Sequence, residues 1–153
     1  MREFGGVLRT AAGLAILSFA GAVTPALACD GLAVENARVI AAPLGVTVYS
    51  AYAVFHNNSA KSLTVTGADS PDFASAQFQR ITRSADRLQM TRETSLVVPP
   101  MHALTLKTGE DQIMLSGPKR EFKVGDKVLV NLYCGSSQRP FNFTVQAPQV
   151  PHP

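Results

Sequence analysis

Met90 and Met114 are the residues of this chain best suited to bind a metal. Thioethers are soft donors that suit Cu(I), need no deprotonation and form no disulfides in an oxidising compartment. Gln112 lies two residues before Met114, so on a strand both side chains point to one face. Gln79 comes from an earlier strand. A Gln side chain offers only a hard amide oxygen, which is a poor donor for Cu(I).

The elements that must position these residues are short strands separated by Gly, Pro, Asn and Asp, with no sustained helical period. Two strands with apolar alternation end the domain, at Lys127–Cys134 and Phe141–Ala147. This pattern predicts an all-β fold, an antiparallel Greek-key β-sandwich. The earlier strands are expected at Ala33–Ala41, Val46–Phe55, Leu63–Ala68, Ala76–Thr82 and Ser95–Val98, with a turn at His56–Ser59.

Ala103–Lys107 and Gln112–Leu115 are expected to form a hairpin around Gly109, because both runs carry strand residues and a four-residue loop separates them. In such a hairpin His102 lies about 15 Å from Gln112, at ~3.3 Å per residue. His102 is therefore not expected to complete a metal site with Gln112.

Residues 1–28 have the pattern of a signal peptide. Arg2 and Arg9 precede an apolar run of small residues, and Ala26-Leu27-Ala28 is a cleavage site of the A-x-A type. The alternative is an uncleaved membrane anchor. The remaining chain is expected to be one sandwich domain, 29–147, followed by a proline-rich tail, 148–153, so the protein is predicted to reside in the periplasm.

Charge excludes one class of partner. The formal net charge is +3 at pH 7, which is too small to indicate nucleic-acid binding. Four arginines lie within positions 80–92, but Asp86 lies among them and Glu93 comes directly after the last one. This pattern favours a solvated face over a docking face for an acidic partner.

Cys29 and Cys134 are the two cysteines. An even count in an exported protein indicates a disulfide. Cys29 would also be the first residue after cleavage, so lipidation of Cys29 is a second interpretation and the route by which the protein would reach a membrane. The position three residues before it is Ala26, where the lipidation signal prefers Leu. A metal-binding or redox thiol is the third interpretation.

The chain resembles the periplasmic copper chaperones of the PCu(A)C type. Ten residues separate Gln79 from Met90, twenty-one separate Met90 from Gln112, and one separates Gln112 from Met114. This is the spacing of that family's metal motif, with Gln at both histidine positions. Further similarity lies at Tyr52-Ala53, Asn57, Ser70-Pro71, Gly125-Asp126 and Ile113-Met114-Leu115.

The resemblance implies a cupredoxin-like sandwich that binds Cu(I) and delivers it to the Cu(A) centre of cytochrome c oxidase. The partner would be an oxidase subunit or another copper assembly factor. Met90 and Met114 match the methionine ligands, whereas no ligand role carries over to Gln79 or Gln112. The alternative is a periplasmic binding or assembly module that kept the fold and lost copper.

Two other classes are disfavoured. A blue-copper carrier needs His and Met soon after its Cys, and no Met follows Cys134. A Cys-His hydrolase would need a free thiol near His56 or His102, and no hydrolase motif is present. The protein is therefore not expected to be an enzyme.

Overall fold

The computed structural model of the protein describes residues 29–149. The predicted signal peptide, 1–28, and residues 150–153 of the predicted tail lie outside the described residues. The described part contains strands and turns, and none of its elements is a helix able to span a membrane. The eleven strands are β1 Leu32–Ile40, β2 Val48–Asn57, β3 Leu63–Val65, β4 Gly67–Asp69, β5 Phe73–Ser84, β6 Arg87–Glu93, β7 Leu96–Val98, β8 Ala103–Thr105, β9 Asp111–Pro118, β10 Lys127–Cys134 and β11 Ser137–Gln146.

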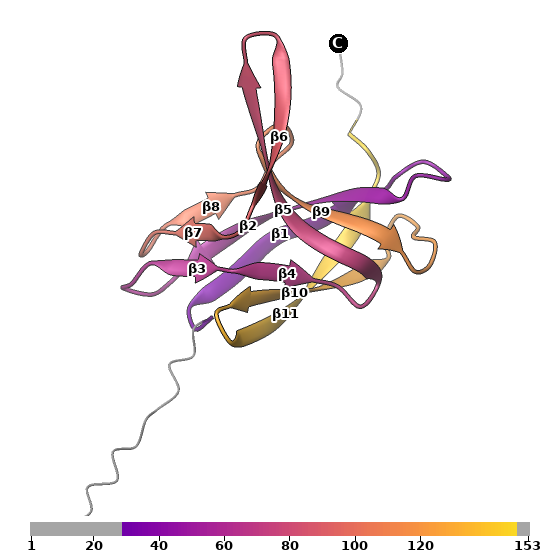
Figure 1. The fold of residues 1–153 in the computed structure, drawn as a ribbon. Helices are drawn as coiled ribbons and strands as arrows, with labels where there is room; N and C mark the ends of the chain where they lie inside the picture. The colour runs from indigo at the N-terminus through magenta and orange to yellow at the C-terminus, as the bar shows by residue number, and fades with distance from the viewer. Residues whose placement is uncertain (1–28, 150–153) are drawn as a thin grey trace, which may run out of the picture.

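Nine of these strands form one sheet in the order β4-β10-β11-β1-β2-β9-β5-β6, with β8 also on β2, while β3 pairs with β7. The sheet closes over a common core, with β10 and β11 below β2 and β9 in Figure 1. The pair β1–β11 is parallel and the other pairs are antiparallel. The predicted all-β, cupredoxin-like sandwich is confirmed, with this one parallel contact added.

The core is built from strands that alternate buried and less buried side chains. Val128, Val130 and Leu132 on β10 and Phe143 and Val145 on β11 are completely buried. Residues two apart on a strand share a face, so each strand offers one apolar face to the interior. Burying a side chain of this size stabilises the fold by about 1.5–3 kcal/mol.

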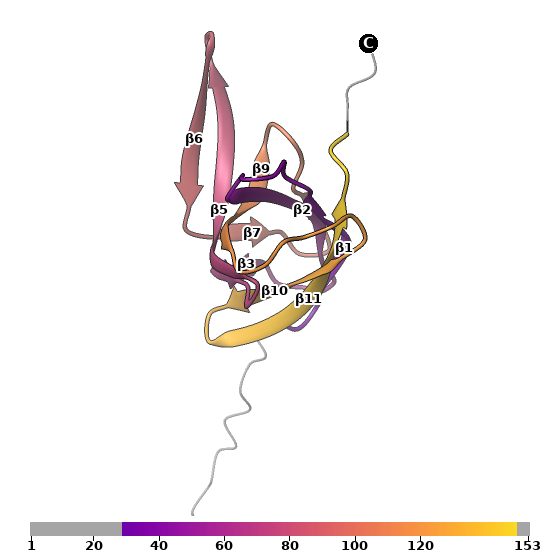
Figure 2. The ribbon, with the colours of Figure 1, turned by 90° about the vertical axis from the view of Figure 1, so that its right-hand side faces the viewer.

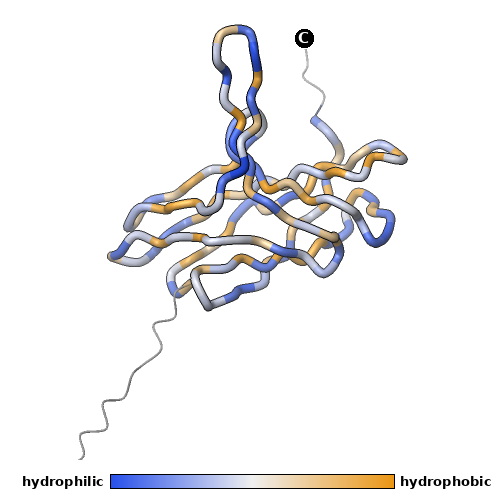
Figure 3. Tube along the Cα trace, viewed as in Figure 1, coloured by the Kyte–Doolittle hydropathy of each residue, from blue (hydrophilic) through white to orange (hydrophobic). Residues whose placement is uncertain are grey.

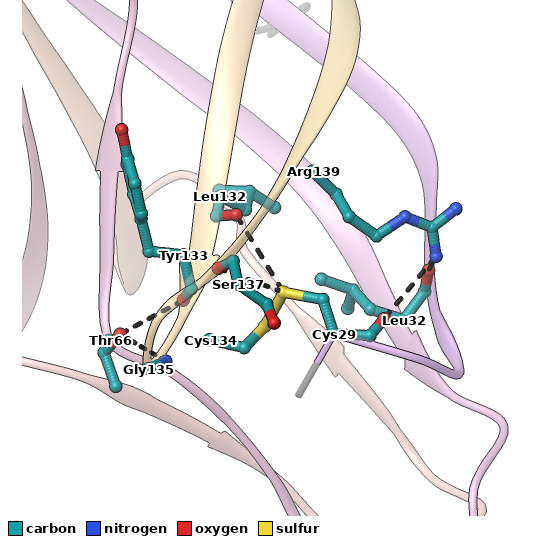
Figure 4. The surroundings of a disulfide bond; sticks show 9 residues. All are labelled: Cys29, Leu32, Thr66, Leu132, Tyr133, Cys134, Gly135, Ser137 and Arg139. Carbon is teal, nitrogen blue, oxygen red and sulfur yellow. Dashed lines mark hydrogen bonds between the residues drawn. A yellow bond between two sulfur atoms is a disulfide. The ribbon is translucent and has the colours of Figure 1, made fainter. Parts of the chain in front are cut away.

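Cys29 and Cys134 form a disulfide whose Cα atoms lie 5.3 Å apart (Figure 4). It joins the residues before β1 to the last residue of β10, and both cysteines are buried. Arg139 closes the same corner, because its guanidinium donates a hydrogen bond to the carbonyl oxygen of Leu32 at 3.2 Å. The predicted disulfide is confirmed. Because this disulfide uses the Cys29 sulfur, Cys29 is neither a free thiol nor available to carry a lipid thioether.

The predicted hairpin of Ala103–Lys107 with Gln112–Leu115 is wrong. β8 and β9 both pair antiparallel with β2, so they run in the same direction. Leu106 stays on β2, where its amide donates to the carbonyl oxygen of Ala53 at 2.8 Å. A turn at 107–110 then leads into β9. β2 is ten residues long, and its edge holds the two shorter strands one after the other.

Strand ends differ from the prediction by up to four residues, and two of the differences change which element a residue belongs to. The expected turn begins later, because His56 and Asn57 still belong to β2. The side-chain amide of buried Asn57 donates to the carbonyl oxygen of Val98 at 2.9 Å, which holds the strand end in place. The expected strand Leu63–Ala68 is divided into β3 and β4, because β3 pairs with β7 and β4 pairs with β10.

The segment that carries Met90, for which no strand was predicted, is β6. It forms a long hairpin with β5, with paired residues from Phe78–Glu93 to Ser84–Arg87. β9 begins at Asp111, opposite Arg80, and beyond this level the hairpin projects from the sandwich (Figures 1 and 2). The end of the hairpin is therefore held by its own pairing and by its turn.

Candidate metal site

Gln79 and Gln112 lie directly opposite each other on β5 and β9, at the root of the projecting hairpin. Both are buried, with 9% and 5% of their surface exposed. Cβ atoms of directly opposite residues on antiparallel strands are about 4.5–5.5 Å apart. The two amides therefore share one place on the sheet, although 32 residues separate them along the chain.

A tyrosine from β2 joins this glutamine pair. The Tyr52 hydroxyl donates a hydrogen bond to Oε1 of Gln112 at 3.0 Å, and Tyr52 is itself only 5% exposed. Arg38 of β1 lies over the Tyr52 ring, with its Cζ atom 5.4 Å from the ring centroid. The oxygen of Gln112, which is the metal-binding atom of an amide, is thus already engaged by a buried donor.

Arg38 and Tyr52 also line a hollow of about 320 Å³ beside the pair, together with Ser50 and Thr108. Its remaining walls are largely apolar and come from the end of β1 and the start of β2. The glutamine pair therefore lies next to an open part of the surface, and Tyr52 forms the boundary between the two.

Met114 and Met90 lie on the same face of the sheet as the glutamines, but at different levels. Met114 follows Gln112 by two residues and pairs with Gln77, whereas Met90 pairs with Ile81, nearer the hairpin tip. On a flat sheet these positions are about 10 Å apart across the strands and about 13 Å apart along them. Met90 is also 57% exposed. The two thioethers do not converge on one point in this arrangement.

The opposite face of the hairpin root carries an ion-pair cluster. The Arg80 guanidinium lies 2.8 Å from Oδ1 of Asp111 on β9 and 3.5 Å from Oε1 of Glu93 on β6. The hydrogen bond to Asp111 is the main cause that raises the pKa of Arg80 above its ordinary value. These half-exposed ion pairs contribute little to stability, but they link three adjacent strands and so help to orient the hairpin.

His102 lies far from the glutamine pair, as expected, although the geometry differs from the predicted hairpin. Its carbonyl oxygen accepts a hydrogen bond from the Asn57 amide at 2.9 Å. Gln112 contacts Tyr52, five residues earlier on the same strand. That separation is about 16 Å at ~3.3 Å per residue.

His56 does not complete a site either. Nε2 of His56 lies 3.2 Å from a carboxylate oxygen of Glu35, at the end of β2 away from the hairpin. His152 lies outside the described residues. Within residues 29–149, no three or more His, Cys, Asp or Glu side chains gather in a way that could hold a metal ion.

Solved structures of PCuAC domains share this fold. The copper-bound PCuAC domain from PmoF2 superposes with a TM-score of 0.64 at 23% identity, covering 77% of this chain and 94% of that one. CuI-DR1885 from Deinococcus radiodurans is 29% identical with a TM-score of 0.59, covering 80% of each chain. Apo-DR1885 is 26% identical with a TM-score of 0.61, covering 95% and 97%. The fold is therefore that of a PCuAC domain.

Within this class, residues 32–146 match the family described as "Putative lipoprotein LpqE-like". The "Putative lipoprotein Lxx21020" of Leifsonia xyli subsp. xyli (strain CTCB07) is 31% identical over 121 residues, or 78% of this chain and 72% of that protein. The chain belongs to the LpqE-like family, which is a PCuAC family.

Sequence reasoning missed the role of Tyr52. Tyr52 lies in a run of strand residues and is one of the positions at which the chain resembles the family. The sequence nevertheless gave no indication of which residue it contacts. The available signal was strand alternation. Tyr52 and Ser50 occupy the face opposite that of Ala51 and Ala53, and a buried Tyr usually finds a hydrogen-bond partner. Identifying Gln112 as that partner required the β2–β9 register.

Proposed function

We propose that this is an exported, Cu(I)-binding protein of the chaperone type with an altered site, in which Met90 and Met114 supply the thioether ligands. The observation that carries the proposal is the direct pairing of Gln79 with Gln112, with Met114 on the same face. These are the motif positions of the PCu(A)C resemblance, and they come together although they are distant in sequence. Relatedness to a protein solved with CuI adds support.

Export is supported by two features. Residues 1–28 have a leader pattern, and the Cys29–Cys134 disulfide suits an oxidising compartment such as the periplasm. A chain with this disulfide cannot carry a lipid thioether on Cys29, because the same sulfur is used. We therefore propose a periplasmic protein that is not anchored through Cys29.

Copper is the cargo in this proposal, and the acceptor is a copper-binding protein such as a cytochrome oxidase subunit or another copper assembly factor. Met90 suits transfer because it is more than half exposed on a projecting hairpin. A thioether there is accessible to an incoming ligand from a partner. No group of the site is assigned a catalytic role, and the protein is not proposed to be an enzyme.

We expect the affinity for Cu(I) to be lower than in a site with two imidazoles. Amide oxygens are hard donors, and Oε1 of Gln112 already accepts a hydrogen bond from Tyr52. Met90 and Met114 are also two strands apart. For both thioethers to hold one ion, the hairpin must bend over the face of β9.

The second candidate is a periplasmic binding or assembly module that no longer binds metal. The Tyr52–Gln112 hydrogen bond favours it, because this bond satisfies the buried side-chain oxygen of Gln112 without a metal ion. In that case Gln79 and Gln112 serve to pack the hairpin root.

Cu(I) competition against a chromophoric chelator tests the proposal. The disulfide-bonded mature chain is compared with the double variant Met90→Ala, Met114→Ala. Met101→Ala is the matched control, because Met101 is 70% exposed and lies before β8. Copper uptake that is lost in the double variant and kept in the control supports the chaperone. Absence of uptake favours the second candidate, whereas equal uptake by all three proteins rules out Met90 and Met114 as the ligands.

A further inference from the structure

The projecting hairpin ends the large sheet, and its outer strand has an open edge. β6 is the last strand in the sheet order and pairs only with β5 among the described residues. Six of its seven residues are exposed. Figure 2 shows both strands standing clear of the sandwich beyond the level of β9. An open edge of this kind is a template for another extended chain.

The register shows which backbone groups face that edge. The Ile81 amide donates to the carbonyl oxygen of Glu110 at 3.0 Å, so Ile81 turns its backbone toward the β9 side. In an antiparallel pair, the N–H and C=O of one residue point to the same side. Its partner Met90 must then turn its own N–H and C=O away from β5, toward the open edge.

Alternation extends this pattern along the strand. Leu88 and Arg92, two residues either side of Met90, also direct their backbone groups outward. Gln89 and Thr91 lie between them and bond to β5 instead. β6 therefore offers three outward-facing backbone positions in a row, separated by two that are already paired.

The side chains of the same three residues define the kind of partner that fits. Leu88 is 63% exposed and Met90 57%, and they lie on one face with Arg92. Arg83, opposite Leu88, lies on this face too. Neither Arg83 nor Arg92 forms an ion pair within residues 29–149. This face therefore carries an apolar strip that lies between two free guanidinium groups. Figure 3 shows that hydrophilic and apolar residues alternate along the hairpin.

We propose that β6 docks an extended acidic segment of a partner protein as an added strand, with its apolar side chains on Leu88 and Met90 and its carboxylates near Arg83 and Arg92. Strand addition combines main-chain hydrogen bonds with side-chain selection in this way. A second copy of this chain fits less well, because β6 carries no carboxylate on this face and a second copy would add further guanidinium groups there. The inference concerns protein docking and holds whether or not copper binds.

The test uses the mature protein in buffer that contains a metal chelator. The probe is a short peptide in which two valines and two flanking glutamates occupy every second position and serines lie between them, so that valines and carboxylates share one face of the strand. Amide hydrogen exchange is followed by NMR. We expect the amides of Leu88, Met90 and Arg92 to exchange quickly in the free protein and about tenfold more slowly with saturating peptide. The amides of Gln89 and Thr91 are protected in both states. Docking through side chains alone would leave the three edge amides unprotected and would overturn the proposal.

Charge variants give the matched comparison. Arg83→Glu with Arg92→Glu should weaken peptide binding about tenfold, equivalent to about 1.4 kcal/mol. Lys61→Glu with Lys123→Glu makes the same change in net charge on loops outside the hairpin, and binding should stay within about twofold. Equal weakening in both pairs overturns the proposal. So does absence of binding at millimolar peptide, or edge protection that grows with protein concentration alone, which would assign the edge to a second copy.

Discussion

The sandwich body and the β5–β6 hairpin are stabilised in different ways. The body holds the fully buried side chains of β10 and β11 and the disulfide at Cys29–Cys134. β6 buries almost nothing, and its two large apolar side chains, Leu88 and Met90, face solvent. The comparison shows that packing in the core does not account for the methionine at position 90. Its side chain is free for a ligand or partner, whereas residue types in the body are constrained by the core.

The two regions meet at the root of the hairpin. On one face Tyr52 of the body bonds to Gln112, which pairs with Gln79 of β5. On the other face Arg80 and Asp111 form their ion pair. If the two regions are independent, changes in the body away from Gln112 and Met114 should alter stability with little effect on copper binding, and changes in the hairpin should do the reverse.

The largest effect on stability is expected from the disulfide. Cys29→Ala with Cys134→Ala removes a link between residues 105 apart in sequence. In the chain-entropy model this lowers the free energy of unfolding by about 4 kcal/mol. Urea denaturation followed by circular dichroism measures the loss. Cu(I) affinity should not change, because the disulfide lies at the corner of β1 and β10. A change in Cu(I) affinity would show that the two regions are coupled.

A matched pair of leucines sharpens the contrast. Leu132→Ala empties a completely buried position on β10 and should cost about 3 kcal/mol, because it leaves a cavity in the core. Leu88→Ala changes a side chain that is 63% exposed on β6, and its cost should stay below about 0.5 kcal/mol. The same urea titration compares them. Similar losses would mean that the hairpin packs more tightly than its exposure indicates.

Restoring imidazoles at the hairpin root is expected to change copper binding. Gln79→His with Gln112→His adds two nitrogen donors beside Met114, and we expect about a hundredfold tighter Cu(I) binding, or about 2.7 kcal/mol. The chelator competition assay measures this. Gln89→His with Gln138→His is the control, because both glutamines are exposed and lie outside the pair. A similar gain in both variants would remove the glutamine positions from the proposed site.

The body could be predicted from sequence because apolar alternation survives in it. The strands at Lys127–Cys134 and Phe141–Ala147 were expected close to where β10 and β11 lie. β6 could not be predicted in this way, because Leu88 and Met90 are its only apolar residues. It is a strand because it pairs with β5 across a turn in which Ala85 adopts a φ of 49°.

Alternation also does not identify a strand's partner. The runs on either side of Gly109 were expected to pair with each other, and instead both pair with β2. The Gln79–Gln112 pair was expected to lie at one site only through the spacing that the family resemblance supplied. Its direct register, and the contact with Tyr52, depend on tertiary pairing between distant segments and could not be read from local sequence.

The smallest predicted effect tests the contact that joins the two regions. Tyr52→Phe removes the donor to Gln112 and leaves a buried amide oxygen unpaired, which should cost about 1 kcal/mol. Tyr49→Phe is the control, because the Tyr49 hydroxyl bonds to no other residue of the described chain. Its cost should stay below about 0.5 kcal/mol.

Combining Tyr52→Phe with Gln112→Leu should cost less than the sum of the single variants, since the second change removes the unpaired oxygen. Copper supplies the sharper criterion. If the Gln112 oxygen is a poor donor for Cu(I), freeing it in Tyr52→Phe leaves Cu(I) affinity unchanged. A clear increase would mean that the hydroxyl competes with the metal for this oxygen. Gln112 would then be a copper ligand, and Tyr52 would belong to the copper site as well as to the body.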